Sequence, residues 1–355
     1  MIDRSCRFAG IVLAVAFLVL GAQSCVGIEP GTNHADEPVR GEISLRAAID
    51  FVDGSAVHWQ QTHGCVTCHT NGVYLITRAD VGVDAPAYLN TRQFARDYLR
   101  QYIVDGEQRS GQRGAVEGIV ATTSFLAISD VKTKGKLEPF TRQALDHIWT
   151  LQSEDGSWNE WLKCHWGPYE VDDHFGVTLA ALAVGMSPDD YRNTPAARAG
   201  LEKLCRYLKN HPPASGHQKA MSLWAAQYVE ELATQDEQRE WTEKLFSLQH
   251  DDGGWALIDL GDDQWQREDD KPQDKQSDGY ATAFVIYALR QTGIPADDER
   301  LQRGLGWLKQ NQRQSGRWFT RSPRRDGKHF ITQAGTNFAV AALKSMEQAP
   351  EVPGD

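Results

Sequence analysis

Three copies of the pattern Gln-x-x-x-Gly-x-Trp constrain the fold of this chain more than any other feature. They occupy residues 152–158, 249–255 and 312–318, and each lies between a segment with the apolar period of a helix and an Ala-rich segment. A repeat of this size normally means that helical hairpins stack and bury a shared core. Within each copy Gly permits a tight turn, while Trp covers the end of the preceding helix and its indole N–H reaches a carbonyl. The motif therefore predicts a structural staple.

Helical periodicity predicts six antiparallel helix pairs. They cover residues 45–59 with 73–80, 91–104 with 115–129, 140–151 with 173–186, 196–209 with 218–233, 237–248 with 278–292, and 298–310 with 331–346. Convincing strand patterns are absent from the sequence, and the connections are polar and rich in Gly and Pro. The pattern predicts an all-α fold, an (α/α)6 toroid or barrel of six helical hairpins with the Ala-rich second helices inside.

The first 24 residues predict export. Arg4 and Arg7 precede an apolar run over 8–20, which is too short to span a membrane, and small residues follow directly before Cys25. This order is typical of a secretory signal. It favours lipoprotein processing with an acylated Cys25, and simple cleavage stays the alternative because Ala22 stands where a lipobox usually has Leu. We expect a protein of the periplasm or cell envelope, attached to the membrane where its N-terminus carries a lipid.

The remaining chain divides into a Pro/Asp/Glu-rich tether over 25–42, the toroid over 43–348 and a short tail over 349–355. The net charge is −11 and no Lys/Arg stripe is present, which argues against nucleic acid as a partner. The sequence also contains no Walker loop, dinucleotide fingerprint or nucleophile elbow. Phosphate-binding and simple serine hydrolase classes are therefore disfavoured.

Polar residues gather in the loops that lead from outer to inner helices. Because these loops all open at one end of a toroid, their residues are expected around a common mouth. Five of the eleven histidines fall there: His69, His165, His174, His217 and His329. Asp173 and Asp278 are placed as helix N-caps, and capping alone is a sufficient explanation for either.

The three Gln/Trp motifs, with Ser-Asp-Gly-Tyr-Ala-Thr-Ala-Phe at 277–284, resemble the squalene-hopene cyclase and protein prenyltransferase superfamily over about residues 90–346. The resemblance implies an α/α toroid with a hydrophobic central cavity for an isoprenoid chain. Seven aromatic residues of the inner helices are then candidates to stabilise a carbocation, with plain core packing as the alternative. They are Phe125, Phe175, Trp224, Tyr228, Tyr280, Phe284 and Phe338.

Glu170-Val171-Asp172-Asp173 resembles the Asp-x-Asp-Asp acid motif of class II terpene cyclases. The resemblance implies that Asp172 donates a proton to an alkene and that Asp173 and Glu170 support it, since clustered carboxyls in an apolar cavity raise one another's pKa. The sequence departs from that family in Glu170, in the adjacent His174 and in lacking a second barrel domain. Capping and metal binding stay open as alternatives.

Cys65-Val66-Thr67-Cys68-His69 matches the attachment signature of c-type haem, in which two thiols bond the vinyl groups and the adjacent His reaches iron. No Met lies between Met1 and Met186, so the second axial ligand would be another His or the haem would be five-coordinate. The candidates are His58, His63, His165 and His174. Zinc is the alternative, because the mouth would also bring Cys164, His165 and His174 toward Cys65 and Cys68. A disulfide or free thiols are the third option.

Three functions follow from the sequence. The first is an enzyme that acts on an isoprenoid or other hydrophobic small molecule, either terpene cyclase/isomerase-like or metal-dependent transferase-like. The second is an exported haem or metal protein for electron transfer on a toroid scaffold, and the third is a non-catalytic binding protein. The acidic stretch over 259–278 is interpreted as a solvated loop, with a cation-binding lid as the alternative.

Overall fold

The computed structural model describes residues 27–106, 115–158, 161–262, 265–328 and 330–347. The expected signal over 1–24, the acylation site at Cys25, the tail over 349–355 and His329 lie outside the described residues. Over the described part the chain is helical, and its strand-like pairing is limited to two isolated bridges. None of the described helices is long and apolar enough to cross a membrane.

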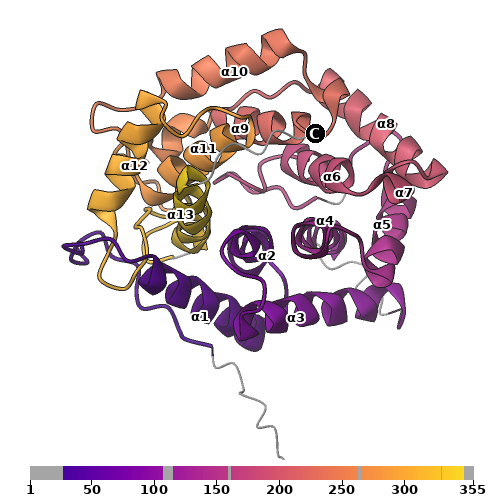
Figure 1. Cartoon of the computed structure of the whole chain (residues 1–355), viewed down its shortest axis with the longest axis horizontal. Helices are drawn as coiled ribbons and strands as arrows, with labels where there is room; N and C mark the ends of the chain where they lie inside the picture. Colours follow the sequence, from indigo (N-terminus) through magenta and orange to yellow (C-terminus); the bar gives the residue numbers. More distant parts are fainter. Residues whose placement is uncertain (1–26, 107–114, 159–160, 263–264, 329, 348–355) are drawn as a thin grey trace, which may run out of the picture.

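Six outer helices surround six inner helices in a closed ring (Figure 1). The outer helices are α1 (Leu45–His63), α3 (Pro86–Ile103), α5 (Pro139–Leu151), α8 (Pro195–Asn210), α10 (Gln235–Ser247) and α12 (Glu299–Asn311). The inner helices are α2 (Val73–Thr77), α4 (Ala115–Lys134), α6 (His174–Met186), α9 (Gly216–Ala226), α11 (Gly279–Gln291) and α13 (Phe330–Glu347). The predicted all-α toroid of six hairpins is thus confirmed.

Shorter elements modify this plan in the connections. A π-helical turn, Cys68–Gly72, leads into α2, and a 3-10 turn, Arg78–Asp80, follows it. The others are α7 (Asp189–Arg192) and the 3-10 turns Glu230–Leu232 and Leu257–Leu260. The inner helix of the first hairpin is consequently short, and α9 ends earlier than the expected residue 233.

Helix starts follow ordinary capping chemistry. Ser215 caps α9 and Thr234 caps α10, each in a capping box with the residue three positions on, while Thr194 caps α8. The outer helices are amphipathic, whereas the inner helices are buried nearly all round, as in α6, where every residue from His174 to Gly185 is buried. Small side chains on the inner helices permit the close approach that the ring requires.

The Trp of each repeat is a staple at the end of its outer helix. Trp158, Trp255 and Trp318 are 0–1% exposed. Each indole N–H donates to the carbonyl ten residues earlier, at 3.2 Å to Ile148, 2.7 Å to Leu245 and 2.8 Å to Leu308. The structural interpretation of the motif is therefore confirmed.

The Gly of each repeat lets the turn touch the next outer helix. Gly156, Gly253 and Gly316 have φ of 100°, 88° and 95°, which side chains rarely adopt. A Cβ at Gly156 would lie 2.1 Å from the carbonyl oxygen of Lys203 in α8. At Gly316 it would lie 2.3 Å from the carbonyl oxygen of Ala47 in α1. Gly is thus required both by the turn and by contact between neighbouring hairpins.

The Gln of each repeat joins one hairpin to the next. The side-chain amide of Gln152 donates to the carbonyl of Gly200 in α8, and that of Gln249 donates to Arg300 in α12. Gln312 makes the equivalent contact with Ser44, the N-cap of α1. The third repeat therefore closes the circle between the last outer helix and the first.

A polar network joins opposite sides of the ring at the end remote from the outer-to-inner loops. Lys132, near the end of α4, forms an ion pair of 2.6 Å with Asp80 and donates a hydrogen bond of 2.9 Å to Tyr287 of α11. The Tyr287 hydroxyl donates in turn to Asp80 at 3.0 Å. Figure 1 shows α4 and α11 on opposite sides of the inner ring, so these three residues span it.

The described part of the expected tether is packed against the ring. Glu37 forms a mostly buried ion pair of 2.6 Å with Arg317, and the backbone N–H of Arg40 donates to the carbonyl of Gln312. The buried side chain of Asn33 donates to the carbonyl of Thr320. Residues 33–40 thus cover the seam where α12 approaches α1.

Candidate functional site

The outer-to-inner loops meet at one end of the toroid, as the alternation of helices predicts. A cleft of about 890 Å³ opens there between the loop 65–68, the ends of α3 and α4, and the α5–α6 loop. We call it the mouth cleft. Its chemically informative lining residues are Cys65, Cys68, Tyr98, Tyr102, Glu117, Phe125 and Glu170. Glu170 also lines a neighbouring pocket of about 530 Å³, together with His69, Tyr169, Arg324 and Phe330.

Two carboxyl groups interact in the mouth cleft. Glu117 lies in the first turn of α4 and is buried, and its Oε2 accepts a 2.8 Å hydrogen bond from the backbone N–H of Leu162. Burial, then repulsion by Glu170, raises the pKa of Glu117 to about 8. Burial also raises the pKa of Glu170. Two carboxyls in this arrangement retain a shared proton near neutral pH, which is the state required of a general acid.

The predicted acid motif contributes one of its three carboxyl groups to the mouth cleft. Glu170 lines the cleft, but Asp172 accepts hydrogen bonds of 2.9 Å from the backbone N–H of His174 and from the side chain of Gln218. Asp172 thus fixes the start of α6, in agreement with capping. Burial raises the pKa of Asp173, which lies 3.2 Å from Lys163. Asp173 occupies the N-cap position of α6, but its side chain makes no capping hydrogen bond, so the capping expected of Asp173 is supplied by Asp172. The catalytic roles assigned to both residues remain predictions.

The other predicted mouth residues divide between surface and core. His165 is exposed, whereas His174 is buried, and burial lowers its pKa to about 4. His217 is buried 2.8 Å from the Tyr280 hydroxyl. Asp278 caps α11 by accepting from Ala281, and burial raises its pKa to about 7.

Aromatic residues of the inner helices pack on one another inside the ring. The ring of Phe284 lies 4.7 Å from His217, 5.0 Å from Phe338 and 5.6 Å from Tyr280. Phe175 contacts Tyr169 in the same group, at 4.8 Å. These contacts have the geometry of an aromatic core. Of the seven aromatic candidates, Phe125 is the one that lines the mouth cleft.

The CxxCH residues do not share one pocket. Cys65 and Cys68 line the mouth cleft, whereas His69 lines the neighbouring pocket, stacked 4.7 Å from Phe330 with its Nδ1 2.8 Å from the Thr70 hydroxyl. A c-type haem needs both thiols and the histidine on one macrocycle. The arrangement does not fit that group, and a haem at Cys65, Cys68 and His69 stays an untested prediction.

Zinc finds no assembled ligand set either. Cys164 is buried and its thiol hydrogen-bonds to Glu170, while His165 is exposed and His174 is buried at the start of α6. In the part of the chain that the structure describes, no group of three or more His, Cys, Asp or Glu residues could hold a metal ion. Zinc therefore also stays a prediction, and none of the chemistry below depends on it.

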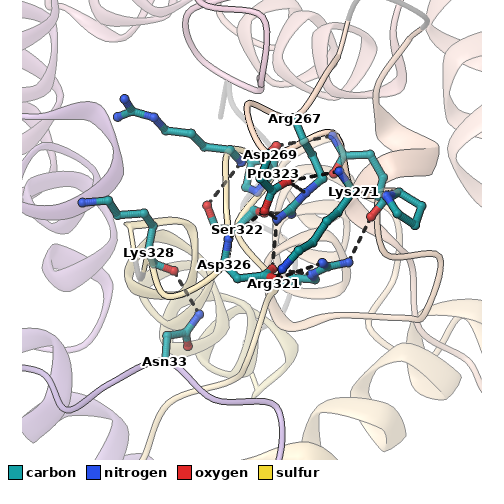
Figure 2. Close-up of polar contacts among 12 residues, drawn as sticks. Asn33, Arg267, Asp269, Lys271, Arg321, Ser322, Pro323, Asp326 and Lys328 are labelled. Carbon is teal, nitrogen blue, oxygen red and sulfur yellow. Dashed lines mark hydrogen bonds and ion pairs between the residues drawn. The ribbon is translucent and has the colours of Figure 1, made fainter.

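Ion pairs hold the insertion over 259–278 against the α12–α13 loop, with Arg267 and Lys271 supplied by the insertion and Asp326 by the loop. Figure 2 shows Arg267 between Asp269 and Asp326, at 2.7 Å and 2.9 Å. Asp326 also pairs with Lys271 and Arg321, both at 2.7 Å. Two acidic residues of the insertion, Glu268 and Asp269, thus have Arg partners, and the cation-binding lid stays a prediction. We call these ion pairs among Arg267, Asp269, Lys271, Arg321 and Asp326 the clasp. They hold the two loops together beside the neighbouring pocket.

Arg324 connects this clasp to the carboxyl pair. It forms an ion pair of 2.8 Å with Glu268 and lies over the ring of Trp166, 4.4 Å from its centroid. Its charge opposes the rise in the pKa of Glu170 that burial produces. Of the two carboxyls, Glu117 is therefore the one that holds its proton more firmly.

Sequence reasoning missed Glu117 as a site residue. It occupies the first turn of an inner helix that is otherwise apolar from Ile119 to Ile128 apart from small hydroxyl residues. A carboxyl at the buried end of such a helix is the signal that could have identified it. Glu170 was itself predicted as a site residue, but its pairing with Glu117 could not be predicted, because the two lie 53 positions apart and the ring brings them together.

No family model and no curated protein matches the chain. Solved structures do. The chain is similar to the type II terpene cyclase MstE from Scytonema, with 14% identity over 84% of this chain and 96% of that one and a TM-score of 0.50. It is similar to an unsaturated glucuronyl hydrolase from Bacillus sp. GL1, with 12% identity over 86% and 98% and a TM-score of 0.53.

A possible member of the GH105 family from Salmonella enterica matches at 11% identity, 85% and 93% coverage and a TM-score of 0.52. At such identities the similarity shows the fold alone. The class that fold and geometry define is an α/α toroid protein with paired carboxyls and two thiols in a cleft at its mouth.

Proposed function

We propose that this protein is an enzyme in which the Glu117–Glu170 pair is a general acid at the toroid mouth. The observation that carries the proposal is the position of both carboxyls on one cleft, with Glu117 buried and Glu170 half-buried beside it. An ordinary exposed glutamate is ionised at neutral pH and cannot donate a proton. Burial raises the pKa of both carboxyls and repulsion by Glu170 raises that of Glu117 further, which keeps one proton on the pair and available for transfer.

The substrate class is an apolar molecule with a carbon–carbon double bond. The cleft wall next to Glu117 is formed by Tyr98, Tyr102 and Phe125, which offer apolar surface and the negative faces of aromatic rings. In the proposed step a carboxyl O–H bond breaks, its proton bonds one alkene carbon, and the other carbon becomes cationic. Loss of a proton from a neighbouring carbon to the carboxylate then completes an isomerisation. In a cyclisation, the π bond of a second alkene first bonds the cationic carbon and leaves the charge on its own far carbon, and proton loss beside that carbon follows.

Two further features support this proposal over binding alone. The solved structures of similar fold include a type II terpene cyclase and an unsaturated glucuronyl hydrolase, so the toroid supports catalysis in those proteins. Placing two carboxyl groups side by side in this cleft also costs folding stability. A purely structural role would not explain that cost, whereas catalysis does. We propose in addition that the enzyme acts outside the cytoplasm, on the strength of residues 1–25.

Deuterium incorporation tests the acid directly. Full-length mature protein is incubated in D2O with squalene and, separately, with geranylgeraniol, and products are analysed by gas chromatography and mass spectrometry. We expect a deuterated isomer or cyclised product from at least one probe. Glu117→Gln and Glu170→Gln should each lower its formation by about 100-fold or more.

Asp172→Asn is the comparison that separates the two candidate acids. In Glu117→Gln the new amide oxygen can still accept from the Leu162 N–H, so this variant keeps the local hydrogen bond. We expect Asp172→Asn to retain most of the activity. Loss of deuteration in Asp172→Asn alone would return the acid role to Asp172, and absence of deuterium in both probes with the wild-type protein would reject acid catalysis on polyenes.

A further inference from the structure

Cys65 and Cys68 lie in the mouth cleft at different depths. Cys65 is half-buried at the rim of the cleft, whereas Cys68 is 4% exposed. Both line the same space, and neither is in a disulfide in this structure. The pair therefore consists of one accessible thiol with a protected thiol three residues away.

The turn that carries the two cysteines is held rigidly. The Asn71 side chain is fully buried; its Oδ1 accepts from the Thr67 N–H at 2.9 Å, and its Nδ2 donates to the Cys65 carbonyl at 3.0 Å. The Gly72 N–H donates to the Thr67 carbonyl at 2.9 Å. A Cβ at Gly72 would lie 2.6 Å from that carbonyl oxygen and from Phe125. The buried amide thus ties both ends of the turn together.

This arrangement differs from what haem attachment requires. The His69 ring points into the neighbouring pocket, where Phe330 and the Thr70 hydroxyl hold it. The thiols therefore share a cleft with each other but not with the histidine of the motif. The reaction open to Cys65 and Cys68 is therefore that of two thiols three positions apart in one cleft.

We propose that Cys65 and Cys68 form a dithiol–disulfide couple that exchanges with an organic disulfide entering the mouth cleft. This function goes beyond acid catalysis by Glu117 and Glu170 and does not depend on it. Cys65 is the attacking thiol, because it is the more exposed, and Cys68 is the resolving thiol. Burial raises the pKa of the Cys68 thiol, which disfavours its thiolate and so its role as the first attacking thiol.

The exchange balances in two steps. The Cys65 sulfur bonds one sulfur of the substrate disulfide, whose S–S bond breaks, and the proton lost from Cys65 ends on the departing thiol. The Cys68 sulfur then bonds the Cys65 sulfur and the mixed disulfide breaks. The proton lost from Cys68 ends on the second substrate sulfur, which leaves as a thiol. Overall the protein dithiol is oxidised by two electrons and the substrate disulfide is reduced to two thiols.

Glutathione disulfide is the probe for this couple. Reduced full-length mature protein is mixed with it, quenched with a maleimide reagent and mapped by peptide mass spectrometry. We expect the wild-type protein to lose two thiols as a Cys65–Cys68 disulfide. Cys68→Ser should accumulate a glutathione adduct at Cys65, and Cys65→Ser should react at least about tenfold more slowly because its remaining thiol is buried.

Three variants and one spectrum complete the test. Cys205→Ser should match the wild type. If serine disturbs the buried position 68, Cys68→Ala repeats the trapping experiment. Circular dichroism checks that each variant is folded. Asn71→Ala should lower the equilibrium constant for disulfide formation by about tenfold, since one buried clamp is lost. Equal trapping in both single cysteine variants, oxidation that links Cys65 to Cys164, or a Soret band after expression in a haem-loading periplasm would overturn the proposal.

Discussion

The side chain of Gln312 holds both backbone groups of Ser44. Its amide oxygen accepts from the Ser44 N–H at 2.7 Å and its amide nitrogen donates to the Ser44 carbonyl at 2.9 Å. A third hydrogen bond of 2.8 Å runs to Gly316 in its own turn. One buried glutamine therefore fastens residues 268 positions apart and turns a row of hairpins into a ring.

Gln312→Ala should destabilise the protein by about 2–4 kcal/mol, because it removes three hydrogen bonds and leaves the part-buried Ser44 N–H and the buried Gly316 carbonyl without the partner that Gln312 provides. Urea denaturation followed by circular dichroism measures this change. Gln302→Ala is the control, since that side chain is exposed and bonds only the carbonyl of Ala296. It should change the free energy of unfolding by less than about 0.5 kcal/mol, and an equal effect of the two substitutions would contradict ring closure by Gln312.

Gly156→Ala should cost more than a positive φ alone explains. Its Cβ would lie 2.1 Å from the Lys203 carbonyl oxygen, so α8 has to move away. Gly135 has φ of 63° and open space around its Cβ, which makes Gly135→Ala the matched control at about 1–2 kcal/mol. Thermal unfolding of both variants should show the larger loss at position 156, and a loss no greater than that of the control would show that the hairpins adapt.

The pH dependence of stability should carry the signature of Glu117. Its folded pKa of about 8 lies above its unfolded value, so the folded state binds more protons and the free energy of unfolding falls as pH rises between about 5 and 8. Glu117→Gln removes this contribution, and its unfolding free energy should decline less over that range than that of the wild type. Parallel slopes in urea titrations at pH 5, 6.5 and 8 would mean that Glu117 is ionised throughout.

Tyr287→Phe tests the network that spans the ring. The change removes a hydroxyl that bonds both Lys132 and Asp80, and we expect a loss of about 1–3 kcal/mol with the ring intact. A double-mutant cycle with Asp80→Asn should give a clear coupling energy, because the two side chains are in direct contact. Additive effects, measured by chemical denaturation, would argue that each residue acts locally.

Periodicity in the sequence was sufficient to predict the helices and the structural role of the Trp in each repeat. The three Trp residues, the Gly turns and the six hairpins depend on contacts within a repeat or between adjacent ones, and such contacts leave a local pattern. The fold follows from that pattern because a closed ring is how amphipathic hairpins of this kind bury their inner faces.

The site required information that no local pattern contains. Asp172 has the sequence setting of an acid, yet its carboxylate is engaged by His174 and Gln218. Glu117 has no motif around it and gains its properties from burial beside Glu170. The cysteines and His69 are adjacent in sequence, but the π-helical turn directs them to different pockets.

The network of Lys132, Asp80 and Tyr287 ties α4, α11 and the turn after α2 together at the end of the ring remote from the mouth. A local opening of any one of these three segments has to break polar contacts to the other two, so this end of the ring resists fraying as a unit.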